Sequence, residues 1–162
     1  LQQPDGSTTL PAFMSTIHSD SFSEEGEDLE ISRSGFTDEW HNKSSWISWR
    51  CKILKKGIYE LYVQSAAPRK QEARHEKTFE TNGELPEIEI EIFNGKKILS
   101  TRGELKEDRR AETPRALHFP EKITSFGNID IPGPGIYDIV LKAEKIAGVG
   151  EGGLAISGIT LK

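Results

Sequence analysis

The chain has 162 residues, of which 35% are hydrophobic and 29% are charged, and its formal net charge is −5. This length suits one globular domain with its own core, and the composition is not that of a disordered chain. The acidic balance argues against nucleic acid as a partner, and no apolar run approaches the roughly 20 residues that a membrane-spanning helix requires. A single cysteine, Cys51, excludes a disulfide framework and a cysteine-based metal site.

No signal peptide is recognisable from Leu1 onward. We therefore expect one domain over residues 1–162, taken from a larger multidomain or processed protein. Near the N-terminus, Leu10 to Ile17 and Leu29 to Ile31 are predicted as strands.

The first strong strand signal runs from Trp46 to Ile53, where apolar and polar residues alternate. Its odd-numbered residues share one face, as in a half-buried antiparallel strand, and this places Trp49 and Cys51 in the core. A turn at Lys55-Lys56-Gly57 follows. The next strand, Ile58 to Gln64, has its odd-numbered residues inward, and we predict that the two strands form a hairpin.

Residues 68–86 are charged on every side and are predicted as an exposed insertion loop or a short surface helix. From Glu87 to Phe93, three isoleucines alternate with three glutamates, which indicates a strand whose glutamates face water. The turn Asn94-Gly95 predicts a second hairpin, to a strand from Lys97 to Ser100.

Three more strands are predicted towards the C-terminus: Phe126 to Ile131, Ile136 to Ala143 and Leu154 to Leu161. A rigid turn, Pro132-Gly133-Pro134-Gly135, separates the first two. The alternation breaks at Ser157-Gly158, which indicates a β-bulge. About eight or nine strands without a long helical pattern predict an all-β fold, an antiparallel β-sandwich of the jelly-roll type.

Several of these segments carry a family resemblance: Asp38-Glu39-Trp40, Trp46 to Ile53, Lys56 to Leu61, Gly127 to Ile131, Gly133 to Leu141 and Gly152 to Leu161. In this order they resemble the carbohydrate-binding modules of families six and thirty-five and their galactose-binding-like relatives. The accessory C-terminal domains of bacterial α-L-fucosidases and sulfatase-like hydrolases are similar as well.

The resemblance implies a noncatalytic accessory module of a glycan-degrading hydrolase that is secreted, periplasmic or on the cell surface. Its partner would be a weakly bound glycan or a catalytic domain of the same polypeptide. The alternative is a purely structural or protein-interaction sandwich that packs on a catalytic domain. Trp46, Ile58 and Tyr62 are the candidates for the apolar outer patch which that alternative requires.

The candidate ligand-binding residues are Trp40, His41, Asn42 and Trp46. A flat aromatic face can stack on the C–H face of a sugar ring while amide and imidazole groups bond its hydroxyls. In the alternative, Trp40 caps the edge of the sandwich. Exposure of Trp40 and Trp46 beside His41 and Asn42 would favour a binding module, and burial of both tryptophans would favour the structural alternative.

No catalytic residues are assigned, and we expect that the chain is not an enzyme. The four histidines lack the spacing of a helical zinc site, and no nucleophile-elbow motif is present. Related modules often hold a structural calcium ion, which takes six to eight oxygen ligands. The acids that would contribute are Asp20, Glu24, Glu25, Glu27, Asp28 and Glu30, and the alternative is a solvated acidic loop.

Overall fold

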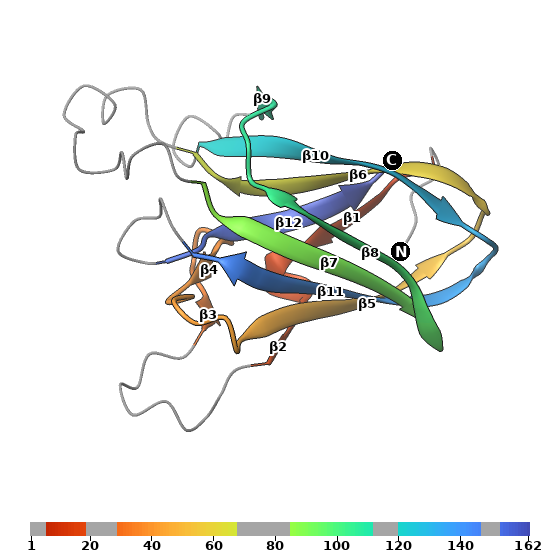
Figure 1. Cartoon of the computed structure of the whole chain (residues 1–162), viewed down its shortest axis with the longest axis horizontal. Helices are drawn as coiled ribbons and strands as arrows, with labels where there is room; N and C mark the ends of the chain where they lie inside the picture. The colour runs from red at the N-terminus through yellow and green to blue at the C-terminus, as the bar shows by residue number, and fades with distance from the viewer. Residues whose placement is uncertain (1–5, 19–28, 68–84, 112–119, 147–152) are drawn as a thin grey trace.

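The computed structural model describes residues 6–18, 29–67, 85–111, 120–146 and 153–162. The elements in these ranges are β-strands and one short 3₁₀ helix (Figure 1). In chain order they are β1 (Thr8–Pro11), η1 (Ala12–Met14), β2 (Thr16–His18), β3 (Glu30–Ile31), β4 (Thr37–Asp38), β5 (Trp46–Ile53), β6 (Gly57–Ala66), β7 (Glu87–Asn94), β8 (Lys96–Glu104), β9 (Arg109–Arg110), β10 (Glu121–Ile131), β11 (Gly135–Lys145) and β12 (Ile156–Leu161).

The strands form two five-stranded sheets and a separate pair, β3 with β4. The first sheet, here called the β6 sheet, has the order β1-β12-β6-β10-β9. The second, the β11 sheet, has the order β2-β5-β11-β7-β8. Every pairing in both sheets is antiparallel. The predicted all-β antiparallel sandwich is therefore confirmed. No helix among the described residues has the length and apolar character needed to cross a membrane.

The core lies between the two sheets and is built by strict alternation along their central strands. Tyr59, Leu61 and Val63 of β6 are buried, as are the matching residues of β11. Removing such a side chain from water contributes about 1.5–3 kcal/mol each. Trp49 and Cys51 are also buried, as predicted, and burial raises the pKa of the Cys51 thiol to about 11.

The prediction that β5 and β6 form a hairpin is wrong. β5 pairs with β2 and β11, whereas β6 pairs with β10 and β12. The Lys55-Lys56-Gly57 turn therefore crosses from one sheet to the other, and the Tyr59 hydroxyl fastens it by donating to Lys55 O at 2.6 Å. The β10–β11 turn also crosses between sheets, and there the Tyr137 hydroxyl donates to Gly133 O at 2.6 Å.

The predicted hairpin at Asn94-Gly95 is confirmed, because β7 pairs with β8 and Asn94 lies opposite Lys96. The predicted bulge is confirmed as well, since the register of β12 against β6 shifts between Ile156 and Gly158. The N-terminal segment from Leu10 to Ile17 is not one strand. It divides into β1 in the β6 sheet, η1 at the crossing and β2 in the β11 sheet.

Two expectations about the outer faces need correction. Glu91 was predicted to face water, but it is only 3% exposed. The apolar patch does not form either, since Trp46 lies in the β11 sheet whereas Ile58 and Tyr62 lie in the β6 sheet. Except for its last two residues, the charged stretch 68–86 lies outside the described residues.

Candidate functional site

The four predicted ligand-binding residues lie in and beside the connection from β4 to β5, but only part of the group faces solvent. Trp40 is completely buried, with an exposed fraction of 0%, whereas Trp46 is 36% exposed. Neither of the two outcomes anticipated from the sequence therefore holds in full. The ring of Trp40 has no free face for a sugar to stack on. A ligand could therefore contact only His41, Asn42 and Trp46 of the four predicted residues.

Trp40 is held in the core by the segment that leads into β12. Its carbonyl accepts a hydrogen bond from Leu154 N at 2.9 Å, and its backbone forms an isolated parallel bridge with Gly153. A Cβ on Gly153 would lie 2.2 Å from Trp40 O, and Gly153 has a φ of +79°. Only glycine meets both demands without strain. The indole N–H of Trp40 donates to Asn42 O at 3.2 Å, so the loop also folds back on itself.

Thr37, the first residue of β4, also bonds to the segment that leads into β12. Its buried hydroxyl donates to Leu154 O at 2.8 Å and accepts a bond from Ile156 N at 2.7 Å. Residues 39–45, here called the pinned loop, are thus tied to the β12 segment by the backbone of Trp40 and, just before the loop, by the hydroxyl of Thr37. The backbone of such a loop loses little freedom when a ligand binds.

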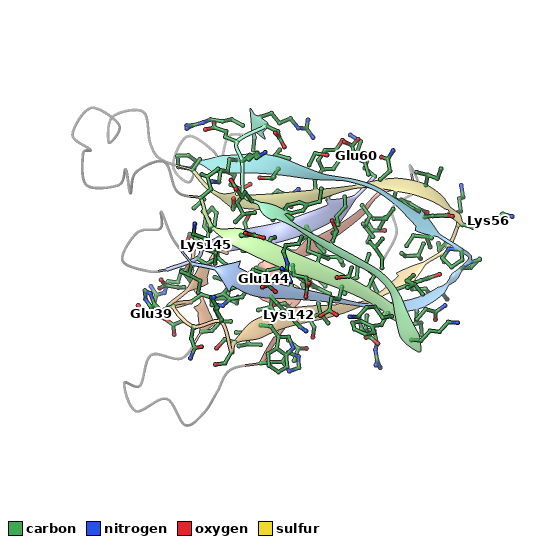
Figure 2. The ribbon with its side chains drawn as sticks, in the orientation of Figure 1. Glu39, Lys56, Glu60, Lys142, Glu144 and Lys145 are labelled. Atoms are coloured by element: carbon green, nitrogen blue, oxygen red, sulfur yellow. The ribbon has the colours of Figure 1, made fainter. Side chains whose placement is uncertain are left out.

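The solvent side of the pinned loop carries Glu39 and His41, and Glu39 lies at one end of the sandwich (Figure 2). Glu39 has a φ of +58°, the one positive φ of a non-glycine residue in the described ranges. Its carboxylate lies 3.6 Å from His41 Nε2, and each of the two side chains is 37% exposed. Left-handed backbone of this kind costs free energy and persists where the surroundings enforce it.

The imidazole of His41 lies against Gly153, since its Nδ1 would be 3.1 Å from a Cβ placed there. Asn42 is also on this surface, and its side-chain oxygen accepts bonds from both the backbone N and the hydroxyl of Ser44 at 2.7 Å each. With that oxygen engaged, the group that Asn42 offers to a ligand is its NH₂. The loop surface therefore combines a carboxylate acceptor, an imidazole and an amide donor.

Trp46 begins β5 and lies on the outer face of the β11 sheet, opposite His18 of β2. Their rings stack with centroids 4.9 Å apart and planes 7° from parallel. His18 Nε2 is hydrogen-bonded to the Ser48 hydroxyl at 2.9 Å, which fixes the orientation of the imidazole. The two rings form a partly exposed aromatic pair, here called the edge stack, and its Trp46 directly follows the pinned loop.

Much of the rest of the outer face of the β11 sheet is covered by ion pairs. The Glu91 carboxylate lies 2.6 Å from Lys97 Nζ and 2.5 Å from Lys142 Nζ. Hydrogen bonds from Lys142 and then Lys97 hold the pKa of Glu91 below its usual range, against the opposing effect of desolvation. The other ion pairs on this face are Arg102–Glu89 at 3.2 Å, Arg102–Glu144 at 3.6 Å and Arg50–Asp138 at 2.9 Å. Figure 2 labels Lys142 and Glu144.

The outer face of the β6 sheet is built differently, around Tyr62. The Arg109 guanidinium lies over the Tyr62 ring, 5.2 Å from its centroid. A hydrogen bond to Glu60 raises the pKa of Tyr62 and lowers that of Glu60, which also accepts from the Ser125 hydroxyl at 2.9 Å. The ring of Tyr62 and the carboxylate of Glu60 are therefore already engaged by neighbouring side chains.

No three His, Cys, Asp or Glu side chains gather as a metal-binding group among the described residues. Most of the acidic stretch predicted to hold calcium, Asp20 to Asp28, lies outside those residues. The structural calcium ion therefore stays a prediction, and Glu30 alone of its proposed ligands can be placed, in β3.

Sequence reasoning missed four residues that shape this site: Thr37, Glu39, Gly153 and His18. Glu39 and Gly153 lie in segments that carried the family resemblance, but nothing in the sequence marks a left-handed glutamate. The contact of Gly153 with Trp40 joins residues that are distant in the chain, and a single sequence gives no sign of it.

No protein-family model matches the chain, and no curated protein matches it in sequence. Solved structures do match. A family 35 carbohydrate-binding module from Clostridium thermocellum aligns with a TM-score of 0.52 at 11% identity, and the alignment covers 96% of each chain. The chain has the fold of a carbohydrate-binding module.

Two larger enzymes contain the same fold as one part of their chains. The GH26-CBM35 β-(1,4)-mannanase of Podospora anserina matches over 98% of this chain and 28% of its own, with a TM-score of 0.52 and 14% identity. The α-L-fucosidase from Vibrio sp. strain EJY3 matches over 82% of this chain and 23% of its own, with a TM-score of 0.50 and 14% identity. The chain thus spans about a quarter of the length of these hydrolases.

Proposed function

We propose that the chain is a noncatalytic carbohydrate-binding accessory module of a secreted, periplasmic or cell-surface glycan-degrading hydrolase. A parent resembling the α-L-fucosidases or sulfatase-like hydrolases remains our proposal for the rest of the polypeptide. The observation that carries the proposal is the pinned loop, which holds Glu39 and His41 side by side and open to solvent on a rigid base.

The chemistry of the pinned loop suits a sugar. A carboxylate accepts two hydroxyl hydrogens at once, and an amide or imidazole supplies the matching donor. Glu39, His41 and Asn42 provide these groups within one short segment. The nearby edge stack of Trp46 and His18 adds an aromatic rim. A shallow surface of this kind supports modest affinity, with Kd roughly 10 µM to 1 mM, or about 4–7 kcal/mol.

A second candidate function is a structural or protein-interaction domain that packs on a catalytic domain. The burial of Trp40 favours it, because one of the two aromatic rings predicted for the sugar site belongs to the core instead. The two functions are compatible, since one surface can bind glycan while another contacts the parent.

The test is a glycan-array screen followed by a titration of tryptophan fluorescence with the strongest glycan. Trp46 is the tryptophan with substantial exposure, because Trp40 and Trp49 are 0% and 3% exposed. A ligand at the edge stack should therefore change the fluorescence of wild type and leave that of Trp46→Phe nearly unchanged. Iodide quenching should likewise reach a single class of tryptophan.

A control that does not depend on fluorescence separates loss of the Trp46 signal from loss of glycan binding. Binding of Trp46→Phe to the immobilised glycan should weaken two- to tenfold and not disappear, because the hydroxyl-binding groups of the pinned loop remain. If no fucosylated, sulfated or plant-type glycan binds, the sugar-binding proposal fails and the structural alternative takes its place.

A further inference from the structure

Phe13 and Met14 stand out on the surface, with exposed fractions of 66% and 68%. They are adjacent residues of η1, in the turn that joins β1 to β2. Here Pro11–Ser15 is called the edge turn. β1 and β2 are the first strands of their sheets, so the edge turn closes one lateral side of the sandwich. Together these two adjacent side chains form a small apolar patch, which is a candidate for contact with another protein surface.

Hydrogen bonds hold the backbone of the edge turn, so the turn is already ordered before a partner binds. The indole N–H of Trp49 donates to Pro11 O at 2.8 Å. The backbone N and the hydroxyl of Ser15 both donate to Ala12 O, at 3.0 and 2.6 Å. Ala12 is completely buried. Phe13 and Met14 are therefore presented outward by a turn whose other residues are anchored, which lowers the entropic cost of binding.

The charge pattern around the edge turn supports an apolar partner. No charged residue occurs from Gly6 to Ile17, although 29% of the chain is charged. Depletion of charge marks the centre of protein–protein interfaces, where Phe and Met are enriched. The outer face of the β11 sheet, by contrast, is covered with ion pairs such as Glu91–Lys97.

The area of the patch bears on whether its partner is a free protein or a tethered domain. Two side chains that are about two-thirds exposed offer on the order of 250 Å², taking 150–250 Å² for a large side chain. A stable complex between free proteins needs about 800 Å² on each partner. A tethered domain binds at an effective concentration in the millimolar range, so a small apolar patch is sufficient.

We propose that Phe13 and Met14 dock the module into an apolar hollow on a neighbouring domain of the same polypeptide. This inference rests on the part of the proposed function that makes the chain an accessory module of a larger hydrolase. It adds the surface through which the module is oriented, on the lateral side closed by the edge turn.

The chain carries its own probe, because Met14 is its single methionine. The experiment measures hydrogen peroxide oxidation of Met14, by peptide mass spectrometry, in this chain alone and in the full-length product of its gene. We expect Met14 to oxidise at least tenfold more slowly in the full-length protein. The Phe13→Ser variant should bring the rate to within about twofold of the free chain, and Ile58→Ser, at a residue 73% exposed, should not.

Several results would overturn the proposal: equal oxidation rates in the two proteins, a full-length product without a second domain, or protection of Met14 in the isolated chain through self-association. Glycan binding is measured on the isolated chain, and Phe13→Ser should leave it unchanged. Absence of a glycan ligand would therefore remove the sugar site without affecting the oxidation result. Unprotected Met14 in a multidomain product would reject the docking surface alone.

Discussion

The pinned loop and the outer face of the β11 sheet both present glutamates, but the two regions use them differently. Glu91 is 3% exposed and is shared by two lysines, so its charge is neutralised by the protein itself. Glu39 is 37% exposed and lies 3.6 Å from one histidine. An acidic residue is therefore a binding candidate when its position is fixed and its oxygens are still open to a ligand.

The two regions also differ in what holds them. The pinned loop depends on close backbone contact at Gly153 and on the uncharged bonds of Thr37. The β11 outer face depends on ion pairs. Steric and uncharged contacts are insensitive to salt and pH, whereas exposed ion pairs are screened by salt. Substitutions in the two regions should therefore respond differently when the salt concentration is changed.

The largest effect on stability is expected from Gly153→Ala, because Gly153 contacts the backbone of Trp40 in the pinned loop. The new Cβ would lie 2.2 Å from Trp40 O at a φ of +79°, so the segment must move. We expect a loss of about 3 kcal/mol of unfolding free energy, or roughly 6–12 °C in Tm, together with loss of glycan binding. The measurement is thermal unfolding followed by circular dichroism.

Gly133→Ala is the matched control, because a Cβ there meets nothing within 4 Å and its φ is not positive. It should change stability by no more than about 0.5 kcal/mol. A Gly153→Ala variant as stable as Gly133→Ala would mean that Trp40 and Gly153 are not in contact in solution.

A moderate effect is expected from Glu91→Gln on the ion-paired face. Two charge-assisted contacts become weaker, and we expect a loss of about 1–2 kcal/mol at neutral pH. The loss of unfolding free energy relative to wild type should shrink as salt is raised, because the two lysines are about half exposed and salt screens them, unlike the loss for Gly153→Ala. The measurement is urea unfolding at low and high salt.

The pH dependence of Glu91 follows from the direction of its shift. Lys142 and Lys97 hold its folded pKa below the value of about 4.3 of an unfolded glutamate. Its contribution to stability is therefore fully present above that pH and is lost as the pH falls through the folded pKa. The advantage of wild type over Glu91→Gln should shrink as the pH falls below about 4.3, and an advantage that does not shrink on acidification would contradict the assignment.

The smallest effect is expected from His18→Ala at the edge stack. Ring pairs contribute about 0.5–1.5 kcal/mol, and this pair is partly exposed, so the lower part of that range applies. Removal of the imidazole uncovers one face of Trp46, and iodide should then quench its fluorescence more strongly. Thr16→Ala, on the same strand, should leave quenching unchanged. If His18→Ala does not alter quenching, the two rings are not stacked in solution.

The alternation of residues was enough to predict the long strands β5, β6, β7, β11 and β12, nearly all of their inward faces and the bulge in β12. It could not assign strands to sheets, because the same pattern fits both members of a hairpin and strands that face each other across the core. That is why β5 and β6 were misplaced. The sheet crossing depends on Tyr59 and Tyr137, whose hydroxyl bonds to Lys55 O and Gly133 O are tertiary details.

The candidate site was only partly predictable for a related reason. The residue types at Trp40, His41, Asn42 and Trp46 indicated a sugar-binding surface, but burial of each ring depends on distant partners. Gly153 draws Trp40 into the core, and His18 covers one face of Trp46. Glu91 shows the same limit, because lysines from two neighbouring strands cover a side chain that alternation places outside.

The most direct test of the pinned loop is isothermal titration of the strongest array glycan into wild type, Glu39→Gln, His41→Ala and Glu107→Gln. Glu107 is the matched control, since its side chain is 39% exposed and is paired with Arg110 on another part of the surface. We predict that Glu39→Gln and His41→Ala weaken binding tenfold or more, about 1.4 kcal/mol, while Glu107→Gln stays within twofold of wild type. Wild-type affinity in Glu39→Gln, with the same Tm, would show that the pinned loop does not bind the sugar.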